Sequence, residues 1–539
     1  MVHPKDASRR KMRRSIYHTL ILIALAIAAG RIAVVTSKQG DTAFLSANDR
    51  SRWCTVASLV EHGTYAIDSQ VAITDEVNQR RHPWDTIDKV RHLGSDGKQH
   101  YYSSKPPLFP TMVAGVYKLV AACTGMVLTD QPIYLTRIIL ALVNLPLFAV
   151  FLFCTIYSID RLCSGDWARR LAVMSTCFAT MLLPFCVSLN NHLPAASATA
   201  LAMWIYIWAA ERTDESYDSS GSDKVAFGWW ALAGVAAAFA AANELPALSM
   251  AALWFVLFAW LSRASIIPFL LGASVVVAGF FVTNLIAHDS LRPPYAHRGN
   301  GDLITRFVYA DSELGPELNA IVQRELVKFQ LVADEMPIEM RSSDEEGRWV
   351  VTAGEQQFAM LRTATQWQLA HWDDWYEYPG TYWKEGGRKG VDLGEPSRLT
   401  YFLHMTIGHH GLFSITPIWL LVPFGMLASM RIGPYDLRRL ALAIFLSSAV
   451  CVAFYLARPL VDRNYGGVSV CFRWLLWFAP LWIVASVPAF EKCEKSLAGR
   501  NLLRGMLVFS VLSVSMALVN PWQSPWIYQF WQFLGWISP

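Results

Sequence analysis

Long uninterrupted runs of apolar residues constrain this 539-residue chain more than any other feature. Each run is about twenty residues long, the length that an α-helix needs to cross the hydrocarbon layer of a membrane. The composition agrees, because 54% of the residues are hydrophobic and 16% are charged, against roughly a quarter charged in soluble proteins. The 22 tryptophans also fit, since tryptophan collects at membrane interfaces. The sequence therefore predicts an all-α polytopic membrane protein.

Eleven runs are predicted to span the membrane. They are 16–36, 134–158, 168–188, 193–210, 227–243, 245–262, 265–287, 401–429, 438–457, 471–490 and 503–520. A further run, 106–126, begins with two prolines and contains a third, which suits a helix at the membrane interface better than a span. With that assignment every short basic loop lies in the cytoplasm, as the positive-inside rule requires. The N-terminus is then cytoplasmic and the C-terminus external, in a cell (inner) membrane.

This topology divides the chain into five parts, two of which are long external loops. The parts are the N-terminus with the first span (1–36), the first external loop with interfacial helices (37–133), spans two to seven (134–287), the second external loop (288–400), and spans eight to eleven with the C-terminus (401–539). Loops far longer than ordinary connections are commonly functional. The basic N-terminus also suits a signal peptide cleaved near Ala26-Ile27-Ala28, but the apolar run continues to Val35, which favours an uncleaved span.

Several function classes receive no support. A net charge of +4 gives no indication of nucleic-acid binding. The sequence contains no GxGxxG or Walker pattern after a strand, which argues against nucleotide-sugar use and ATP-driven transport. The nine cysteines show no CxxC pair; Cys54 and Cys123 are both predicted to be external, but nothing in their spacing favours a disulfide.

Two motifs in the first external loop could carry chemistry. Asp49-x-x-Arg52-Trp53 begins an apolar stripe at helical spacing, which predicts an amphipathic helix on the outer membrane surface. A carboxylate in a first helical turn is favoured by the helix dipole, so Asp49 either caps this helix or performs chemistry. Lys105 precedes Pro106-Pro107-Leu108, and at the level of the lipid phosphates it either binds a phosphate or snorkels to water.

In their order, these two motifs resemble those of the glycosyltransferase C superfamily, near the protein O-mannosyltransferases and the aminoarabinose transferases of lipid A. Those proteins typically carry Asp-Glu-x-Arg-Tyr and then Glu-Lys-Pro-Pro-Leu. The motif resemblance covers roughly the first two hundred residues, and beyond them only the architecture is similar. Two positions depart from the pattern: Arg50 stands in place of the second acidic residue, and Ser104 in place of the glutamate before the lysine.

The resemblance implies an inverting transfer of a sugar from a polyprenyl-phosphate donor to an acceptor hydroxyl on the external face. It implies that Asp49 orients or deprotonates the acceptor, that Lys105 neutralises the leaving phosphate, and that Arg52 positions Asp49 or the phosphate. Some relatives hold a metal with acidic residues near these positions. Because Arg50 and Ser104 replace two of them, a divalent metal is an open question here.

Further candidate residues lie where predicted spans meet the external face. They are His192, in Asn190-Asn191-His192; Glu244, in Asn243-Glu244-Leu245-Pro246; His409 and His410, in Gly408-His409-His410-Gly411; and Arg473. Ionisable groups at such positions are candidates for substrate binding. The alternatives are a polar turn for Glu244 and snorkelling for Arg473. Adjacent residues on a helix point a quarter-turn or more apart, so both histidines are not expected to bind one ion.

The sequence as a whole favours a membrane glycosyltransferase, a hexosyl- or pentosyltransferase, whose partners are a polyprenyl-phosphate sugar, membrane lipid and an acceptor protein, lipid or glycan. A transporter or flippase of lipid-linked sugars is the first alternative. Transporters usually show internal repeats and charges near the bilayer midplane, and neither is evident here. A non-enzymatic membrane scaffold that binds glycans or proteins is the second alternative, and it would tolerate the loss of Asp49.

Overall fold

Six helices in a computed structural model of the chain are long and apolar enough to cross a membrane. The structure describes residues 4–73, 83–215, 225–309, 315–384 and 386–537. The six candidate spans are Lys11–Val34 within α1 (Pro4–Val34), α5 (Pro132–Leu162), His192–Thr213 within α8 (His192–Glu215), Arg263–His288, which includes α11 (Ile266–His288), α16 (Tyr435–Ala457) and α19 (Leu497–Ala517). This agrees with the predicted multi-pass membrane protein.

A seventh candidate span is bent. It consists of Arg473–Ala485, which includes α17 (Ala479–Ala485), followed by α18 (Val487–Glu494), and the two parts meet at 46°. Pro488 explains the bend, because a proline inside a helix clashes with the carbonyl group four residues earlier. The other predicted spans are shorter apolar helices. They are α9 (Phe227–Asn243), α10 (Leu248–Leu261) and α15 (Leu421–Ile432), and the interfacial run forms α4 (Leu108–Thr124).

Two predicted spans are interrupted in the structure, so the count of eleven is not confirmed. The run 168–188 divides into α6 (Asp166–Phe178) and the short α7 (Leu182–Phe185), and Pro184 in α7 accounts for the break. The run 401–429 begins as α13 (Arg398–Thr406), which ends before two glycines and Pro417. Apolarity alone did not distinguish these broken segments from continuous spans.

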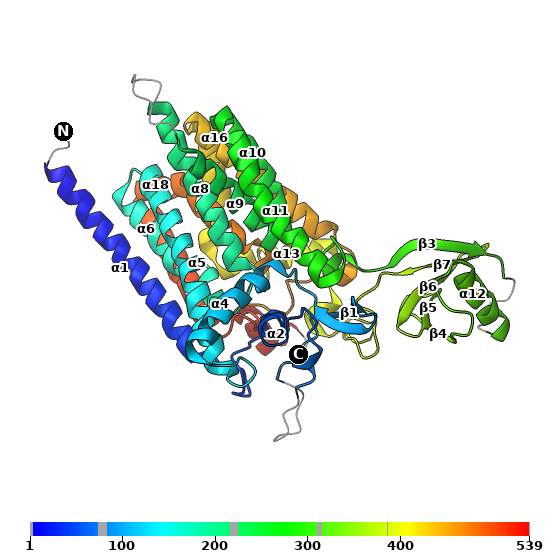
Figure 1. Cartoon of the computed structure of the whole chain (residues 1–539). Helices are drawn as coiled ribbons and strands as arrows, with labels where there is room; N and C mark the ends of the chain where they lie inside the picture. The colour runs from blue at the N-terminus through cyan, green and yellow to red at the C-terminus, as the bar shows by residue number, and fades with distance from the viewer. Residues whose placement is uncertain (1–3, 74–82, 216–224, 310–314, 385, 538–539) are drawn as a thin grey trace. The chain divides into compact units, whose positions relative to one another are not determined.

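Contact clustering divides the chain into two compact units. Unit 1 consists of Met1–Asp49, Gly115–Phe280 and Gly390–Pro539 and contains most of the long helices. Within unit 1 the most enclosed candidate span is α8, with 78% of its apolar window buried, and it packs against α5 and α9 (Figure 1). Because α8 begins at His192, that residue lies at the end of the most protected helix of unit 1.

Helices α9 and α11 approach each other through two glycines. A Cβ atom on Gly234 would lie 1.9 Å from the carbonyl oxygen of Phe269, and a Cβ atom on Gly272 would lie 1.9 Å from that of Ala231. Both distances are far below van der Waals contact. The close packing of these helices therefore depends on the absence of a side chain at both positions, as is common between membrane helices.

Unit 2 consists of Arg50–Ala114 and Phe281–Lys389, so most of both predicted external loops fold together. It contains a two-stranded sheet and a five-stranded antiparallel sheet in the order β3-β7-β6-β5-β4 (Figure 1). The strands are β1 (Lys89–Leu93), β2 (Gln99–Ser103), β3 (Asn300–Phe307), β4 (Ile338–Ser342), β5 (Arg348–Ala353), β6 (Gln356–Arg362) and β7 (Trp367–Trp372). The expectation of an all-α chain is wrong for these loops.

The larger sheet has its own hydrophobic core. Helix α12 (Pro316–Lys328) buries Leu318, Val322 and Leu326, which recur every four residues and so lie on one face. These leucine and valine side chains cluster with apolar residues of β5, β6 and β7. Strands β5 and β6 are joined by a tight turn in which Gly354 adopts a φ of +58°, a conformation that favours glycine.

Helix α2 (Ala47–Glu61) differs from the expected surface helix. Its apolar Trp53 is fully buried, but so are the polar Asp49 and Ser51, and Arg52 is only 4% exposed. A helix that lies on a membrane surface needs an exposed polar face. The polar side chains of α2 instead lie inside the protein, where each requires a hydrogen-bonding or charged partner.

Candidate functional site

The turn at residues 188–192 between α7 and α8, here called the α7–α8 turn, is held in shape by Asn190. Its Nδ2 donates to the carbonyl oxygens of Phe185 and Ser188, at 2.7 and 2.8 Å. Its Oδ1 accepts hydrogen bonds from the backbone N–H groups of His192 and Leu193, the first residues of α8. The amide therefore caps α8 and fixes where the helix begins, which in turn fixes the position of the His192 side chain.

Asp49 links the start of α2 to this turn. Its Oδ2 accepts from the backbone N–H of Leu45 at 3.0 Å, and its Oδ1 accepts from the backbone N–H of Leu189 at 2.9 Å. The start of α2 is capped by Ser46, whose hydroxyl accepts from the N–H of Asp49. The carboxylate is fully buried. Asp49 therefore does more than stabilise the start of α2, because its Oδ1 atom also binds the backbone of Leu189, 140 residues away along the chain.

Glu244, His192 and Arg473 form a chain of contacts, here called the Arg473–His192–Glu244 relay. Arg473 donates from Nη1 to Nε2 of His192 at 2.6 Å. Since a guanidinium has no acceptor, Nε2 carries the lone pair and the ring proton is on Nδ1. Nδ1 then donates to Oε1 of Glu244, which also accepts from Nδ2 of Asn191 at 2.7 Å. The relay joins a cation to a carboxylate through a neutral imidazole.

Arg473 is oriented by two further contacts in unit 1. Its Nε donates to the carbonyl oxygen of Gly466 at 2.7 Å, and its guanidinium lies 4.7 Å from the ring centre of Trp522. Gly466 has a φ of +92°, and a Cβ atom there would lie 2.4 Å from Nε of Arg473. The indole N–H of Trp522 donates to the hydroxyl of Ser188 in the α7–α8 turn. Arg473 is 7% exposed, so its guanidinium is buried rather than snorkelling.

Four residues that the sequence indicated therefore meet around one turn of unit 1. Asp49 lies in the first turn of α2, His192 begins α8, Glu244 follows α9, and Arg473 begins the bent span. All four are at most 7% exposed. Buried charges are rare unless they are paired, and the relay provides such a pair. The convergence of these four segments makes this the principal candidate site.

His409 and His410 lie beside the segment that holds Arg473. The His410 ring stacks on Tyr465 with a centroid distance of 4.1 Å, and its carbonyl oxygen accepts from the backbone N–H of Phe472. The two histidines contact each other through their Nδ1 atoms. Burial lowers the pKa of His409 to about 3, with neighbouring His404 adding to the effect, so the imidazole is neutral at pH 7.

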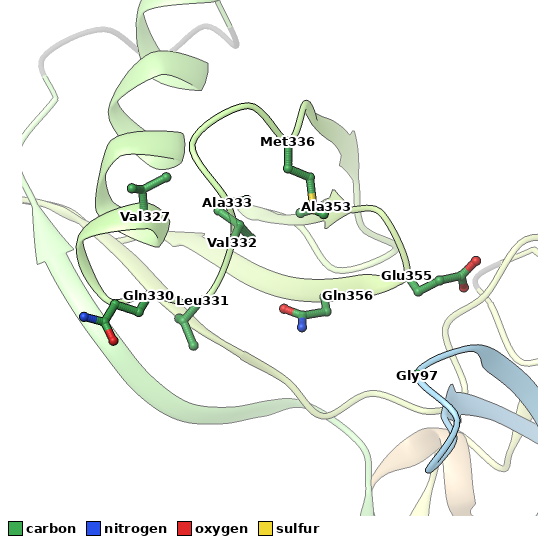
Figure 2. A pocket seen from close by; sticks show the side chains of 10 residues that line it. All are labelled: Gly97, Val327, Gln330, Leu331, Val332, Ala333, Met336, Ala353, Glu355 and Gln356. Atoms are coloured by element: carbon green, nitrogen blue, oxygen red, sulfur yellow. The ribbon is translucent and has the colours of Figure 1, made fainter.

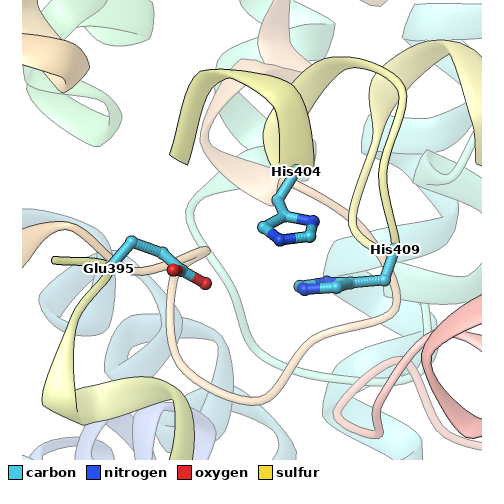
Figure 3. A group of neighbouring side chains, drawn as sticks. All are labelled: Glu395, His404 and His409. Atoms are coloured by element: carbon cyan, nitrogen blue, oxygen red, sulfur yellow. The ribbon is translucent and has the colours of Figure 1, made fainter. Parts of the chain in front are cut away.

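His409 also belongs to a group with Glu395 and His404. One ligand atom from each residue lies within 4.8 Å of the others, and Figure 3 shows the carboxylate and the two rings turned towards one another. His410 is not among these three residues. Two imidazoles and a carboxylate are ligands typical of a transition metal.

The candidate residues of unit 2 form a separate set. Lys105 forms an ion pair with Asp88 at 3.1 Å, and the carbonyl oxygen of Asp88 accepts from the hydroxyl of Ser51 and from the backbone N–H of Ser104. Lys105 therefore already has a carboxylate partner. Arg52 is buried, so it is not an exposed anion-binding group in this conformation.

A cluster of imidazoles and aromatic rings lies in the interior of unit 2. Nε2 of His92 contacts Nδ1 of His288 at 3.0 Å, and the His92 ring stacks on both Tyr102 and Trp375. His297 stacks on the same tryptophan with a centroid distance of 3.4 Å. Burial lowers the pKa of His92 to about 4. The tryptophan and tyrosine rings of segment 375–383 thus help to pack a small domain.

Unit 2 also contains a cavity of about 590 Å³ (Figure 2). Its lining comes from the end of α12 and the loop that follows, from the turn between β5 and β6, and from Gly97 in the turn between β1 and β2. Glu355 is the single ionisable residue among those that line it. The cavity therefore offers apolar surface for binding, and no group in it is arranged for catalysis.

Several residues of these sites were not indicated by the sequence. They are Asp88, Glu395, His404, Gly466 and Trp522. Gly466 followed by Gly467 was a visible signal of unusual backbone, and both have a positive φ. The others gave no local signal, because each meets its partner only through the fold.

No family model and no curated protein matches this chain. Solved structures of the oligosaccharyltransferase of Archaeoglobus fulgidus are similar to it. The complex with zinc and sulfate has 12% identity and a TM-score of 0.42, and the match covers 96% of this chain and 55% of that chain. The complex with an inhibitory peptide and a dolichol-phosphate has 12% identity and a TM-score of 0.39, and covers 97% and 58%.

The chain thus spans little more than half of the length of the structures it matches. At these TM-scores and identities the likeness establishes neither a shared fold nor a shared activity. What this protein does has to be argued from its own residues.

Proposed function

We propose that this protein is a membrane glycosyltransferase that moves a sugar from a polyprenyl-phosphate donor to an acceptor hydroxyl, with inversion at the anomeric carbon. The observation that carries the proposal is the convergence of Asp49, His192, Glu244 and Arg473 around the α7–α8 turn. A donor of this kind has a tail in the bilayer and an anionic head at its surface. An enzyme that uses it needs cationic groups where membrane helices end, and Arg473 begins such a helix.

Arg473 is proposed to bind the donor phosphate. Guanidinium groups pair strongly with phosphate oxygens, and the contacts to Gly466 and His192 hold this one in a fixed orientation. Donors that are fixed in advance stabilise charge that develops in a transition state without having to reorganise. The carboxylate of Glu244 keeps His192 in its Nδ1–H tautomer, so that Nε2 accepts from Arg473. Glu244 and His192 are thus positioning residues for the cation.

Asp49 is proposed as the general base. The acceptor O–H proton passes to its carboxylate, the acceptor oxygen forms a bond to the anomeric carbon, and the bond from that carbon to the phosphate oxygen breaks. The electron pair leaves with the phosphate, whose added negative charge Arg473 stabilises. Both carboxylate oxygens of Asp49 accept backbone hydrogen bonds, which hold the carboxylate in one orientation. Because Asp49 is fully buried, the acceptor reaches it only after residues that cover it move.

Lys105 is proposed as a phosphate-binding group of unit 2, as the family resemblance implies. Its ion pair with Asp88 would then exchange for a phosphate. Asp88 is held by hydrogen bonds to its backbone, so it would stay in place while the lysine changes partner.

The test is sugar transfer by the purified full-length protein in liposomes, using a panel of polyprenyl-phosphate sugars and a membrane extract as acceptor. Mass spectrometry identifies the product and nuclear magnetic resonance its anomeric configuration. Removing a fixed electrostatic donor typically lowers kcat by about 10²–10³, so Arg473→Met should lower transfer by that factor. Arg458→Met is the matched control, because Arg458 pairs with Asp462 outside the relay, and it should leave transfer unchanged.

Two outcomes would contradict the proposal. If no donor in the panel gives a glycosylated product while a labelled lipid-linked sugar crosses the bilayer, the protein is a flippase. If transfer occurs and Arg473→Met matches the wild type, the relay is not the phosphate site.

A further inference from the structure

Three metal-ligating side chains come together outside the relay. Glu395 precedes α13, His404 lies in its last turn, and His409 lies in the turn that follows the helix (Figure 3). Their ligand atoms lie within 4.8 Å of one another, and His409 is 5% exposed. The three residues come from one short stretch of chain that folds back on itself.

Neighbouring residues orient two of these side chains. The hydroxyl of Tyr465 donates to Oε1 of Glu395 at 2.7 Å, which leaves Oε2 to face the histidines. Nδ1 of His409 contacts Nδ1 of His410, so Nε2 of His409 is the atom available for a ligand. Metal-binding histidines almost always use their other ring nitrogen for such a contact, and metal-binding carboxylates are hydrogen-bonded in the same way.

His404 has a buried nitrogen that no described residue satisfies. Its Nδ1 has no hydrogen-bond partner among the described residues, and it lies where a Cβ atom on Gly408 would be, at 2.5 Å. Gly408 therefore leaves the space that this ring occupies. A buried ring nitrogen without a partner loses the free energy of a hydrogen bond, and a metal ion bound at that nitrogen would supply the missing partner.

We propose that Glu395, His404 and His409 bind one divalent transition metal, with zinc the ion best suited to the site, and leave one coordination position open. Two imidazole nitrogens and one carboxylate oxygen form a ligand set that zinc accepts with a fourth position for water or substrate. Zinc bonds of about 2.0–2.2 Å place tetrahedral ligand atoms about 3.3–3.6 Å apart. Binding therefore draws the ligand atoms closer than their present 4.8 Å limit.

The side chains can make this change by rotation. The rings of His404 and His409 stack with a centroid distance of 4.0 Å and an angle of 22° between their planes. Stacked rings cannot both direct a lone pair at one ion, so one ring must tilt. His404 makes no hydrogen bond from Nδ1 that would oppose the tilt, and His409 can remain in contact with His410.

A metal here would also hold the segment that carries Gly466. The backbone N–H of Glu395 donates to the carbonyl oxygen of Arg463 at 2.8 Å, and Tyr465 donates to the Glu395 carboxylate. Fixing Glu395 therefore fixes residues 463–466. The carbonyl oxygen of Gly466 accepts from Arg473, so the proposed metal supports the relay through the backbone and is expected to act as a positioning element.

The test measures metal binding and does not depend on the proposed sugar transfer. The full-length protein is purified in detergent with an affinity tag that lacks histidine, stripped with a chelator and titrated with zinc or cobalt. Elemental analysis gives the stoichiometry, and the visible spectrum of bound cobalt reports its coordination. The wild type should bind one equivalent. Glu395→Gln, His404→Gln and His409→Gln should each weaken binding at least 10-fold, and Tyr465→Phe by about 10-fold or more, as expected for a residue that orients a ligand.

His371→Gln serves as the control, because His371 is exposed on β7, and it should bind metal as the wild type does. Gel filtration and thermal unfolding in chelator show whether each variant is folded. The proposal is wrong if the wild type binds no metal, or if the folded His404→Gln and Glu395→Gln variants retain the same single equivalent with the same affinity. Loss of metal with unchanged sugar transfer would support the site and remove its link to the relay.

Discussion

Nη1 of Arg473 lies 2.6 Å from Nε2 of His192, and this single contact decides the tautomer of a buried imidazole. The proton is then on Nδ1 and is donated to Glu244. The relay places a full positive charge and a full negative charge inside the protein, separated by one neutral ring. Its two ends depend on each other, because each supplies the countercharge that the other needs.

The first prediction concerns this dependence. Glu244→Gln keeps the shape of the side chain but leaves Arg473 without its countercharge, so it should destabilise the protein by about 3–5 kcal/mol. The double variant Glu244→Gln/Arg473→Met removes both charges and should be more stable than the sum of the single effects by about 1–3 kcal/mol. Thermal and denaturant unfolding in detergent measure both quantities.

The partly exposed pair Arg458 and Asp462, at 3.3 Å, provides the matched double-mutant cycle. Its coupling should be below about 1 kcal/mol, as for other ion pairs in contact with solvent. Equal coupling in the two cycles would mean that the relay charges are screened by solvent and that the relay is not a buried pair.

The second prediction concerns Asp49. In Asp49→Asn one carboxylate oxygen becomes an NH₂ group, which cannot accept from a backbone N–H, so one of the two contacts is lost and stability should fall by about 1–3 kcal/mol. If Asp49 is the general base, kcat should fall by about 10²–10⁴ with the donor KM unchanged. If it only positions the α7–α8 turn, the donor KM should rise as well.

Steady-state kinetics over a range of pH separate these two roles, because a base leaves an acidic limb in the pH profile that the variant lacks. Asp41→Asn is the control, since Asp41 is exposed and accepts from the Ser37 hydroxyl outside the site. Wild-type kcat in Asp49→Asn would exclude both roles.

The third prediction concerns packing between α9 and α11. Gly234→Ala would place a methyl group 1.9 Å from the carbonyl oxygen of Phe269, so the two helices must separate. Forcing extra volume into a packed interior typically destabilises by about 1–3 kcal/mol. Gly505→Ala, in the interior of α19 with no atom near the added methyl group, should be neutral or stabilising by up to about 1 kcal/mol. Unfolding in detergent tests both, and similar effects at the two positions would contradict the helix contact.

The fourth prediction is a pH dependence in unit 2. His92 titrates at about 4 in the folded protein against 6.5 in the unfolded chain. As pH falls from 6.5 towards 4, the unfolded chain takes up a proton that the folded protein does not bind, so stability decreases. Above pH 6.5 both states are neutral at this residue and the contribution is constant. The slope for one such group is about 1.4 kcal/mol per pH unit.

Hydrogen exchange of the β1 and β2 amides in the full-length protein measures this effect locally. Exchange should accelerate below pH 6.5 beyond the intrinsic rate, and His92→Phe, which keeps a ring between Tyr102 and Trp375, should flatten the dependence. An unchanged slope in the variant would assign the titration to another group.

Much of the membrane architecture could be predicted from the sequence, because a span depends on local apolarity and length. α1, α5, α8, α11, α16 and α19 all fall on predicted spans. The errors have a common physical origin in proline and glycine, which break helices without lowering apolarity. Pro184 divides one predicted span, and the glycines before Pro417 divide another. The larger sheet was missed because its strands are short and lie in a polar segment. Such a segment contains no long stretch of alternating apolar and polar residues that would indicate a strand.

The candidate site was predicted in part. His192 and Arg473 are charged or polar groups at the ends of apolar runs, which is a local signal, and the structure brings them into contact. His404 and Glu395 were missed because their proximity depends on two features of the fold. One is the turn at Gly408, and the other is the contact with Tyr465, which lies 61 residues or more further along the chain. Lys105 was expected to be available for a phosphate, but its ion pair with Asp88 forms only through the tertiary fold.

The division of unit 2 into two chain segments has a consequence for biosynthesis. Residues 115–280, which include helices α5, α8, α9 and α10, are made after Ala114 and before Phe281. At a synthesis rate of roughly 5–20 residues per second, the first segment waits about 10–30 s for its partner. During that interval β1 and β2 lack Trp375 and Tyr376, the rings that complete their core. A ribosome-bound chain that ends before residue 375 should therefore be a preferred client of chaperones on the side of the membrane where unit 2 folds.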